Sequence, residues 1–152
     1  MLRKTVIVRV LVCGAGVQGS FLAATMHQAG IDVILLARGD RLRDIQLRGV
    51  RFAIHPSTEV ISVPVPVTSD TAAVSESDSV FVVMQKQQAI DLTPTLAASR
   101  SDNTVVCYIG NNGTCDADYR GHIPGDYVLL ASWAWEAIDL GITCGCSSKR
   151  PP

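Results

Sequence analysis

The sequence predicts an α/β fold built on a doubly wound, mostly parallel β-sheet in a single domain. One observation is a strand, helix, strand pattern that ends at Ala37, with a glycine-rich turn after its first strand. Another is the composition, because aliphatic residues abound while aromatic residues make up only 5% of the chain, which suits strands buried on both faces of a parallel sheet. Finally, 152 residues of which 47% are hydrophobic suffice for one core.

The first unit is defined by a change of hydrophobic period. A β-branched run from Thr5 to Cys13 predicts a buried strand, and the glycines after it predict an abrupt turn. Apolar residues then recur at helical spacing from Val17 to Ala29, and Gly30 ends the helix. A second apolar run from Ile31 to Ala37 predicts another strand, which should lie parallel to the first through a right-handed crossover.

The next segment predicts a short helix, one regular strand and one stretch that prolines interrupt. We expect Asp40 to cap a helix that ends at Arg48, before Gly49. Residues Val50 to Ile54 alternate as a strand. The stretch from Val60 to Val67 carries two prolines, which cannot donate to a ladder, so it should form an edge or an irregular excursion.

The remaining elements follow from shorter patterns. Pro94 should kink the predicted helix over residues 89–98, or mark the start of a new one. Residues 142–152 show no apolar period, so we expect a domain over residues 1–141 and an irregular tail. The other expected elements are strands over residues 79–84, 104–109 and 127–135 and a short helix over residues 116–120.

Charge, cysteine content and hydrophobic runs argue against several classes of partner and of cellular location. The formal net charge is −1, so no long-range field would attract nucleic acid or an anionic membrane. The five cysteines show no disulfide framework, and Cys144 and Cys146 lack further ligands at zinc-like spacing, so we expect a reducing cytoplasm and no metal site. Arg9 interrupts the run that would imitate an export signal, and no stretch has the roughly 18 apolar residues needed to span a bilayer.

The turn GAGVQG, from Gly14 to Gly19, is the main functional motif. This GxGxxG pattern is weak alone, but here it follows a buried strand and opens a helix, as in Rossmann-type dinucleotide-binding domains. Gly14 would permit the turn, Gly16 would admit the pyrophosphate and Gly19 would let the helix pack on the strand. We therefore expect Gly14, Ala15, Gly16, Val17, Gln18 and Gly19 to bind the cofactor; the alternative is a glycine-rich turn without a ligand.

The end of the second strand indicates which cofactor is bound. An acidic residue there would accept hydrogen bonds from an adenosine ribose, but Ala37 and Arg38 occupy the place. An arginine can bind a 2′-phosphate with a charge-assisted fork, so we expect NADP(H) rather than NAD. In the alternative, Arg38 is a solvated surface residue and Asp40 takes the ribose.

Four motifs together resemble the ketopantoate reductases (2-dehydropantoate 2-reductases). They are GAGVQG, LLARGDRL, VFVVMQKQQ and YIGNNGT, and they follow the first, second, fourth and fifth strands of the nucleotide-binding fold. The resemblance covers residues 8–141 and implies the N-terminal NADP-binding domain of an NADPH-dependent reductase. In such an enzyme, hydride passes to the ketone of 2-dehydropantoate or a similar 2-keto acid in the pantothenate pathway. Another Rossmann-type 2-keto acid reductase would share the glycine loop but not all four motifs.

The resemblance also implies site residues beyond the glycine loop. The family lysine after the fourth strand matches Gln85 in the register that keeps Gln88, with Lys86 as an uncertain substitute. The family asparagine at the boundary of nicotinamide and substrate matches Asn112, and less well Asn111. Ala137 would line the nicotinamide.

This chain departs from the family pattern because we do not find the family's C-terminal domain in it. The family takes its general-acid lysine and a substrate-binding glutamate from a helical C-terminal domain, which we do not find in this sequence. A missing acid costs about 10²–10⁴ in rate, so we expect a truncated or frame-shifted chain that is catalytically incomplete alone. The alternative is a non-catalytic NADP-binding or partner-binding module. An exposed domain interface would also favour self-association.

Overall fold

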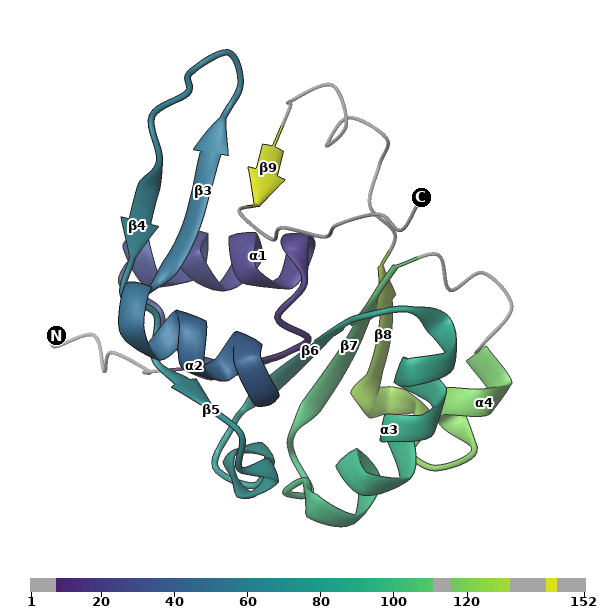
Figure 1. Cartoon of the computed structure of the whole chain (residues 1–152). Coiled ribbons are helices and arrows are strands. Elements are labelled where there is room, and N and C mark those ends of the chain that lie inside the picture. Colours follow the sequence, from purple (N-terminus) through teal and green to yellow (C-terminus); the bar gives the residue numbers. More distant parts are fainter. Residues whose placement is uncertain (1–7, 111–115, 132–141, 145–152) are drawn as a thin grey trace, which may run out of the picture.

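The computed structural model describes residues 8–110, 116–131 and 142–144, and its main element is a six-stranded parallel sheet (Figure 1). The strand order is β5-β2-β1-β6-β7-β8. Counted along the chain within this sheet, that is the order 3-2-1-4-5-6 of a Rossmann-type fold, which confirms the predicted fold class. The strands are β1 (Arg9–Cys13), β2 (Asp32–Leu36), β5 (Val67–Thr68), β6 (Ser79–Val83), β7 (Val105–Ile109) and β8 (Val128–Ala131).

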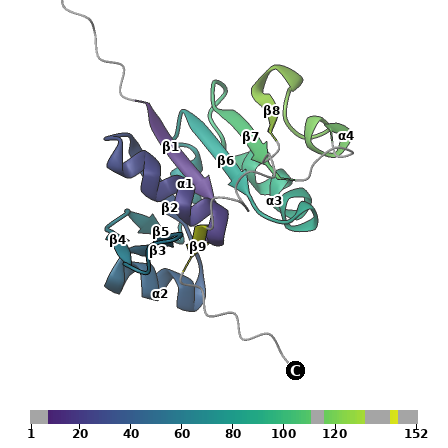
Figure 2. The ribbon, with the colours of Figure 1, turned by 90° about the horizontal axis from the view of Figure 1, so that it is seen from above.

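Helices pack on both faces of the sheet, which makes it doubly wound (Figures 1 and 2). One core layer joins β1, β6 and β7 to helices α3 (Lys86–Ser99) and α4 (Asp116–Arg120), and to the 3₁₀ turn η1 (Thr71–Val74). The other joins β1 and β2 to helices α1 (Val17–Gln28) and α2 (Gly39–Arg48). A second 3₁₀ turn, η2 (Gly125–Tyr127), leads into β8.

A small antiparallel sheet stands beside α1. Its order is β4-β3-β9, formed by β4 (Ile61–Val63), β3 (Val50–Ile54) and β9 (Ile142–Cys144). The two prolines after β4 keep this segment at an edge, as expected. The strand β9 was not expected, because residues 142–152 were predicted to be irregular; it begins with two β-branched residues and pairs with the free edge of β3.

Two predicted helix features are wrong. Asp40 does not cap α2, because the Leu42 amide bonds the carbonyl of Arg38, so Arg38 is the N-cap and Asp40 lies in the first turn. There its carboxylate pairs with Arg43 and lies near the positive end of the helix dipole. Helix α3 starts before Ala89, at Lys86, and it contains the exposed Pro94, so no new helix begins there.

The core layer under α3 contains a buried hydrogen bond between side chains of α3 and β7. The Thr93 hydroxyl donates to the carbonyl of Ala89 at 2.8 Å and lies 2.8 Å from the Tyr108 hydroxyl, with all three residues buried. The Tyr108 ring stacks on Tyr119 of α4 with centroids 3.7 Å apart. These contacts satisfy the buried hydroxyls, whose desolvation would otherwise be costly. In the described part of the chain, no helix is long and apolar enough to cross a membrane.

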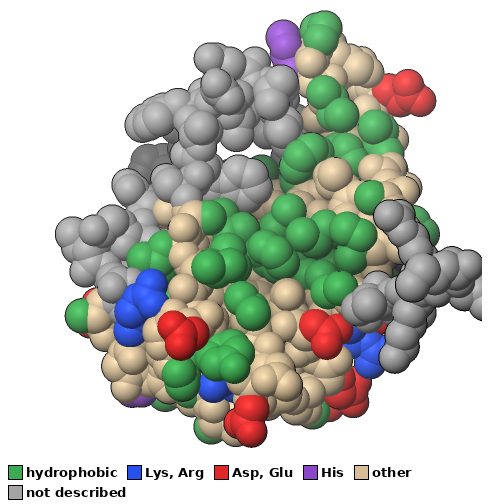
Figure 3. Space-filling model, turned by 180° about the vertical axis from the view of Figure 1, so that it is seen from behind, with side chains coloured by type: hydrophobic (Ala, Val, Ile, Leu, Met, Phe, Trp, Pro, Cys, Tyr) green, Lys and Arg blue, Asp and Glu red, His purple; other side chains and the backbone are tan. Residues whose placement is uncertain are grey.

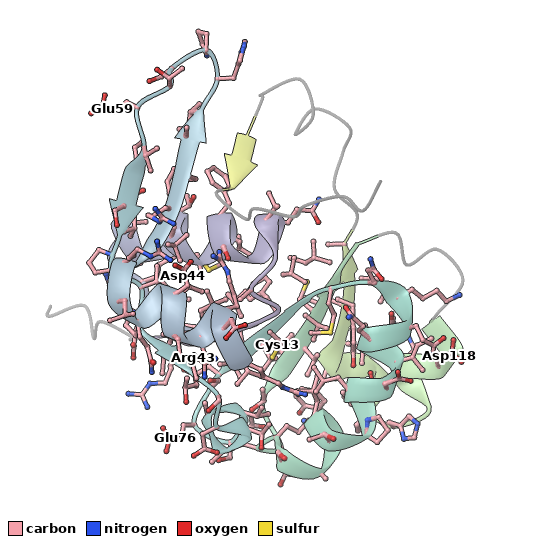
Figure 4. The ribbon with its side chains drawn as sticks, viewed as in Figure 1. Cys13, Arg43, Asp44, Glu59, Glu76 and Asp118 are labelled. Carbon is pink, nitrogen blue, oxygen red and sulfur yellow. The ribbon has the colours of Figure 1, made fainter. Side chains whose placement is uncertain are left out.

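Cys13 lies at the end of β1, fully buried in the interior (Figure 4). Burial raises the pKa of its thiol to about 12, although the nearby charge of Arg38 acts in the opposite direction. The folded state therefore holds the proton more tightly than the unfolded state, whose thiol titrates near 9. By linkage, this contribution to stability is complete below pH 9 and is lost between about pH 9 and about pH 12.

We predict that Cys13→Ala flattens the alkaline fall in the free energy of unfolding. The wild-type chain should lose up to about 1.4 kcal/mol more per pH unit than the variant within this window, because the variant lacks the buried thiol of Cys13. Urea unfolding at about pH 8 and about pH 10 measures the difference. Parallel pH profiles for the two proteins would contradict the assignment.

Candidate functional site

The loop between β1 and α1 is held against the sheet by two glycines. Gly14 has a φ of 114°, and a Cβ on it would lie 2.2 Å from the carbonyl oxygen of Val83, in β6. A Cβ on Gly19 would lie 1.9 Å from the carbonyl oxygen of Gly14. Only glycine fits either position, because a side chain would have to displace backbone. The loop, the first turn of α1 and the end of β6 therefore meet without intervening side chains.

The next part of the loop faces open space. No atom lies within 4 Å of where a Cβ on Gly16 would be, and Gly16, Val17 and Gln18 are exposed. Gly16 is the N-cap of α1 and supplies no side-chain cap, and the first turn holds no acidic residue. The first N–H groups of a helix lack intrahelical partners and carry about half a positive charge. The geometry thus provides an open helix terminus of the kind at which anions bind in other proteins.

The carboxyl ends of β1, β2 and β6 meet at the point where the strand order reverses. The chain leaves β1 toward β2 and β5 on one side, and returns to β6 on the other side. Ligands of open α/β sheets bind in the crevice at this edge. The structure therefore brings the glycine loop, Arg38 after β2, and Gln85 and Lys86 after β6 to one edge.

Arg38 and Asp40 occupy different positions at the start of α2. Arg38 is exposed in the N-cap position, and its charge acts on the thiol of Cys13 at the end of β1. Arg38 follows β2, whose last residue, Leu36, pairs with Cys13 directly before the loop. The Asp40 side chain is 96% exposed and is paired with Arg43, whose side chain is 71% exposed.

The remaining predicted site residues fall into two groups. Gln85 is the N-cap of α3 and Lys86 its first residue, and both side chains are exposed. Asn111, Asn112 and Ala137 lie outside the residues that the structure describes. The last described residue before the asparagines is Gly110, with a φ of 157° and an amide that bonds the carbonyl of Ala131 at 3.0 Å.

One residue of the site was missed by sequence reasoning. Arg41 of α2 donates from Nε to the Ala15 carbonyl at 3.0 Å and from Nη2 to the Ser20 hydroxyl at 3.0 Å. Ser20 is fully buried and itself donates to the Ala15 carbonyl at 3.1 Å. The sequence does show an arginine one turn after Arg38. It cannot show that this arginine bonds a backbone carbonyl, because every residue has one.

Comparison with known proteins agrees with this geometry. A family model described as ketopantoate reductase PanE/ApbA matches residues 10–143. No curated protein matches the chain significantly.

Solved structures share the fold. A PanE/ApbA family ketopantoate reductase from Ralstonia eutropha JMP134 superposes with a TM-score of 0.65 at 21% identity, over 82% of this chain and 40% of that chain. The 2-dehydropantoate 2-reductase from Porphyromonas gingivalis W83 superposes with a TM-score of 0.66 at 20% identity, over 81% of this chain and 45% of that chain. A D-mandelate dehydrogenase, solved with NADH and anilino(oxo)acetate, superposes with a TM-score of 0.68 at 16% identity, over 82% of this chain and 40% of that chain. The chain spans less than half the length of these proteins.

We predict that Gly19→Ala destabilises the domain by about 2 kcal/mol, because the added methyl overlaps the backbone of Gly14. Urea unfolding measures the change. Gly16→Ala is the matched control: its methyl meets open space, so only a small loss from the poorer N-cap is expected. Equal stability losses in the two variants would contradict the close contact described at Gly19.

Proposed function

The chain belongs to the ketopantoate reductase family, and on this premise we propose that it is the NADP(H)-binding domain of a ketopantoate reductase-like oxidoreductase. Such an enzyme transfers hydride from NADPH to the ketone of 2-dehydropantoate or a similar 2-keto acid. The observation that carries the proposal is the uncapped N-terminus of α1, which the glycine loop presents at the switch point of the sheet. A dinucleotide pyrophosphate fits this terminus, because it brings negative charge to free N–H groups.

We assign the 2′-phosphate of NADP to Arg38. It stands at the end of β2 beside the loop, where a carboxylate would otherwise bind a free ribose. The side chain at the preceding position is the buried Ala37. Asp40, the alternative ribose ligand, is turned toward Arg43.

The other contacts of the proposed site come from the loops after β6 and β7. Gln85 and Lys86 begin α3 at the cofactor edge, where they would contact the bound dinucleotide. We propose Asn112 as the residue between nicotinamide and substrate, and Ala137 as part of the nicotinamide wall. Hydride transfer itself belongs to the cofactor; these residues hold its ring against the ketone.

The alternative function is a non-catalytic NADP-binding or partner-binding module. In the family, the general-acid lysine belongs to the helical C-terminal domain, so these 152 residues alone should bind cofactor in the cytoplasm without efficient turnover. Sustained oxidation of NADPH when ketopantoate is added to this chain would exclude the module.

We predict that Arg38→Ala weakens NADPH binding by about 10- to 100-fold and leaves NADH binding nearly unchanged, because only NADPH carries the 2′-phosphate. Titration of the purified chain, followed by nucleotide fluorescence, gives both dissociation constants. Arg43→Ala removes an exposed guanidinium from the same helix and should change neither constant.

Other outcomes of this titration have clear meanings. If neither nucleotide binds the wild-type chain, the proposed function fails for these residues. If Arg38→Ala leaves NADPH binding intact while Asp40→Asn weakens NADH binding, the cofactor is NAD and Asp40 is the ribose ligand.

We also propose that the chain self-associates through an apolar face of the main sheet. Figure 3 shows hydrophobic side chains gathered on the face seen from behind. On β6 and β7, Phe81 and Ile109 are only half-buried, while the residues next to them in sequence point into the α3 layer. Next to them, the edge strand β8 exposes 54% of Leu129, which pairs with Cys107 and so lies on the same face of the sheet as Ile109. An apolar surface of this kind favours association.

We predict that light scattering reports a mass above that of the monomer for the wild-type chain, and a lower mass for Leu129→Glu. The charge would have to be buried in the contact, which opposes association. Leu47→Glu alters a residue that is 83% exposed on α2, outside this face, and should leave the mass unchanged. A monomeric wild-type chain would refute the proposal.

A further inference from the structure

We propose that Arg41 is a positioning residue that holds the glycine loop in the shape required to bind the pyrophosphate. The inference rests on the proposed function, because it concerns how the same site is organised. It assigns a role to an arginine that does not itself need to touch the cofactor.

Arg41 closes a small network across the loop. Its Nε and the Ser20 hydroxyl both donate to the Ala15 carbonyl, while its Nη2 donates to the Ser20 hydroxyl. Its Nη1 donates to Asp44 at 3.1 Å, one turn further along α2. The Arg41 side chain is only 21% exposed, so water competes weakly for these bonds. A planar guanidinium can satisfy these three acceptors at once, and a lysine ammonium lacks this fork geometry.

The network acts on the peptide group that faces the anion site. The Ala15 carbonyl and the Gly16 N–H belong to one planar trans peptide, so they point in opposite directions. One donor from α2 and one from α1 hold this carbonyl oxygen, so the Gly16 N–H points away from both donors. Gly16 has no side chain to limit its rotation, so this anchor is needed to preorganise the loop.

Asp44 in turn holds Arg41 in place. It is contacted by Arg48 and by Arg51 as well as by Arg41, which keeps its carboxylate fixed on α2 (Figure 4). Because Arg38 begins the same helix, α2 both presents the proposed 2′-phosphate ligand and anchors the pyrophosphate loop. The two arginines should therefore affect different parts of the dinucleotide.

The test compares binding of NADPH, NADH and adenosine 2′-monophosphate, which lacks the pyrophosphate. Arg41→Ala should weaken NADPH and NADH binding by the same factor, about tenfold or more, and should leave adenosine 2′-monophosphate binding unchanged. Arg38→Ala should give the opposite pattern, losing NADPH and adenosine 2′-monophosphate but keeping NADH. Arg41→Lys should restore part of the dinucleotide affinity, since one donor can still reach the Ala15 carbonyl. Arg43→Ala is the control on α2.

A second measurement needs no ligand. The Gly16 amide signal in an ¹⁵N–¹H spectrum should shift in Arg41→Ala and in Ser20→Ala, but not in Arg43→Ala, because only the first two lose a donor to the Ala15 carbonyl. If Arg41→Ala does not fold, Ser20→Ala and Arg41→Lys carry the test.

The failures can be told apart. Unchanged dinucleotide binding in these variants, or an equal loss of adenosine 2′-monophosphate binding, overturns the role of Arg41 and leaves the proposed function standing. A wild-type chain that binds adenosine 2′-monophosphate but neither dinucleotide overturns both.

Discussion

The fold and the site depend on one constraint, the close backbone contact between the start of α1, the end of β1 and the end of β6. Gly14 and Gly19 leave no room for a side chain there. Because the helix sits directly against the sheet, its first turn lies at the edge where β1 and β6 end. The donors of the anion site are thus placed by the packing of the core, and any residue with a Cβ at these two positions would move them.

The main sheet could be predicted because its signals are local. Each buried strand is a short apolar run, and the glycines mark the turn into α1. The start of α2 could not be located to the residue, because Arg38 and Asp40 compete for the cap and only the bond from Leu42 to Arg38 decides between them. The strand β9 was missed because Ile142–Cys144 is ordinary in sequence, and its pairing depends on the free edge of a distant strand.

For the candidate site, sequence reasoning could name the residues that carry a motif or a charge. The glycine loop and Arg38 lie where the motif predicts, at one edge of the sheet. The role of Arg41 could not be predicted from the sequence, because it depends on the direction of a backbone carbonyl in another element. The roles of Asn112 and Ala137 stay predictions, since both lie outside the described residues.

The pairing of β9 with β3 bears on how the domain folds and opens. Cys144 pairs with Phe52, so this ladder joins segments that are far apart along the chain. Closing such a long loop costs chain entropy before the short ladder contributes any stabilisation. The ladder should therefore form after the βαβ core, and its amides should exchange hydrogen by local opening, well before those of β1 and β6. The small sheet would then loosen while the cofactor edge stays intact.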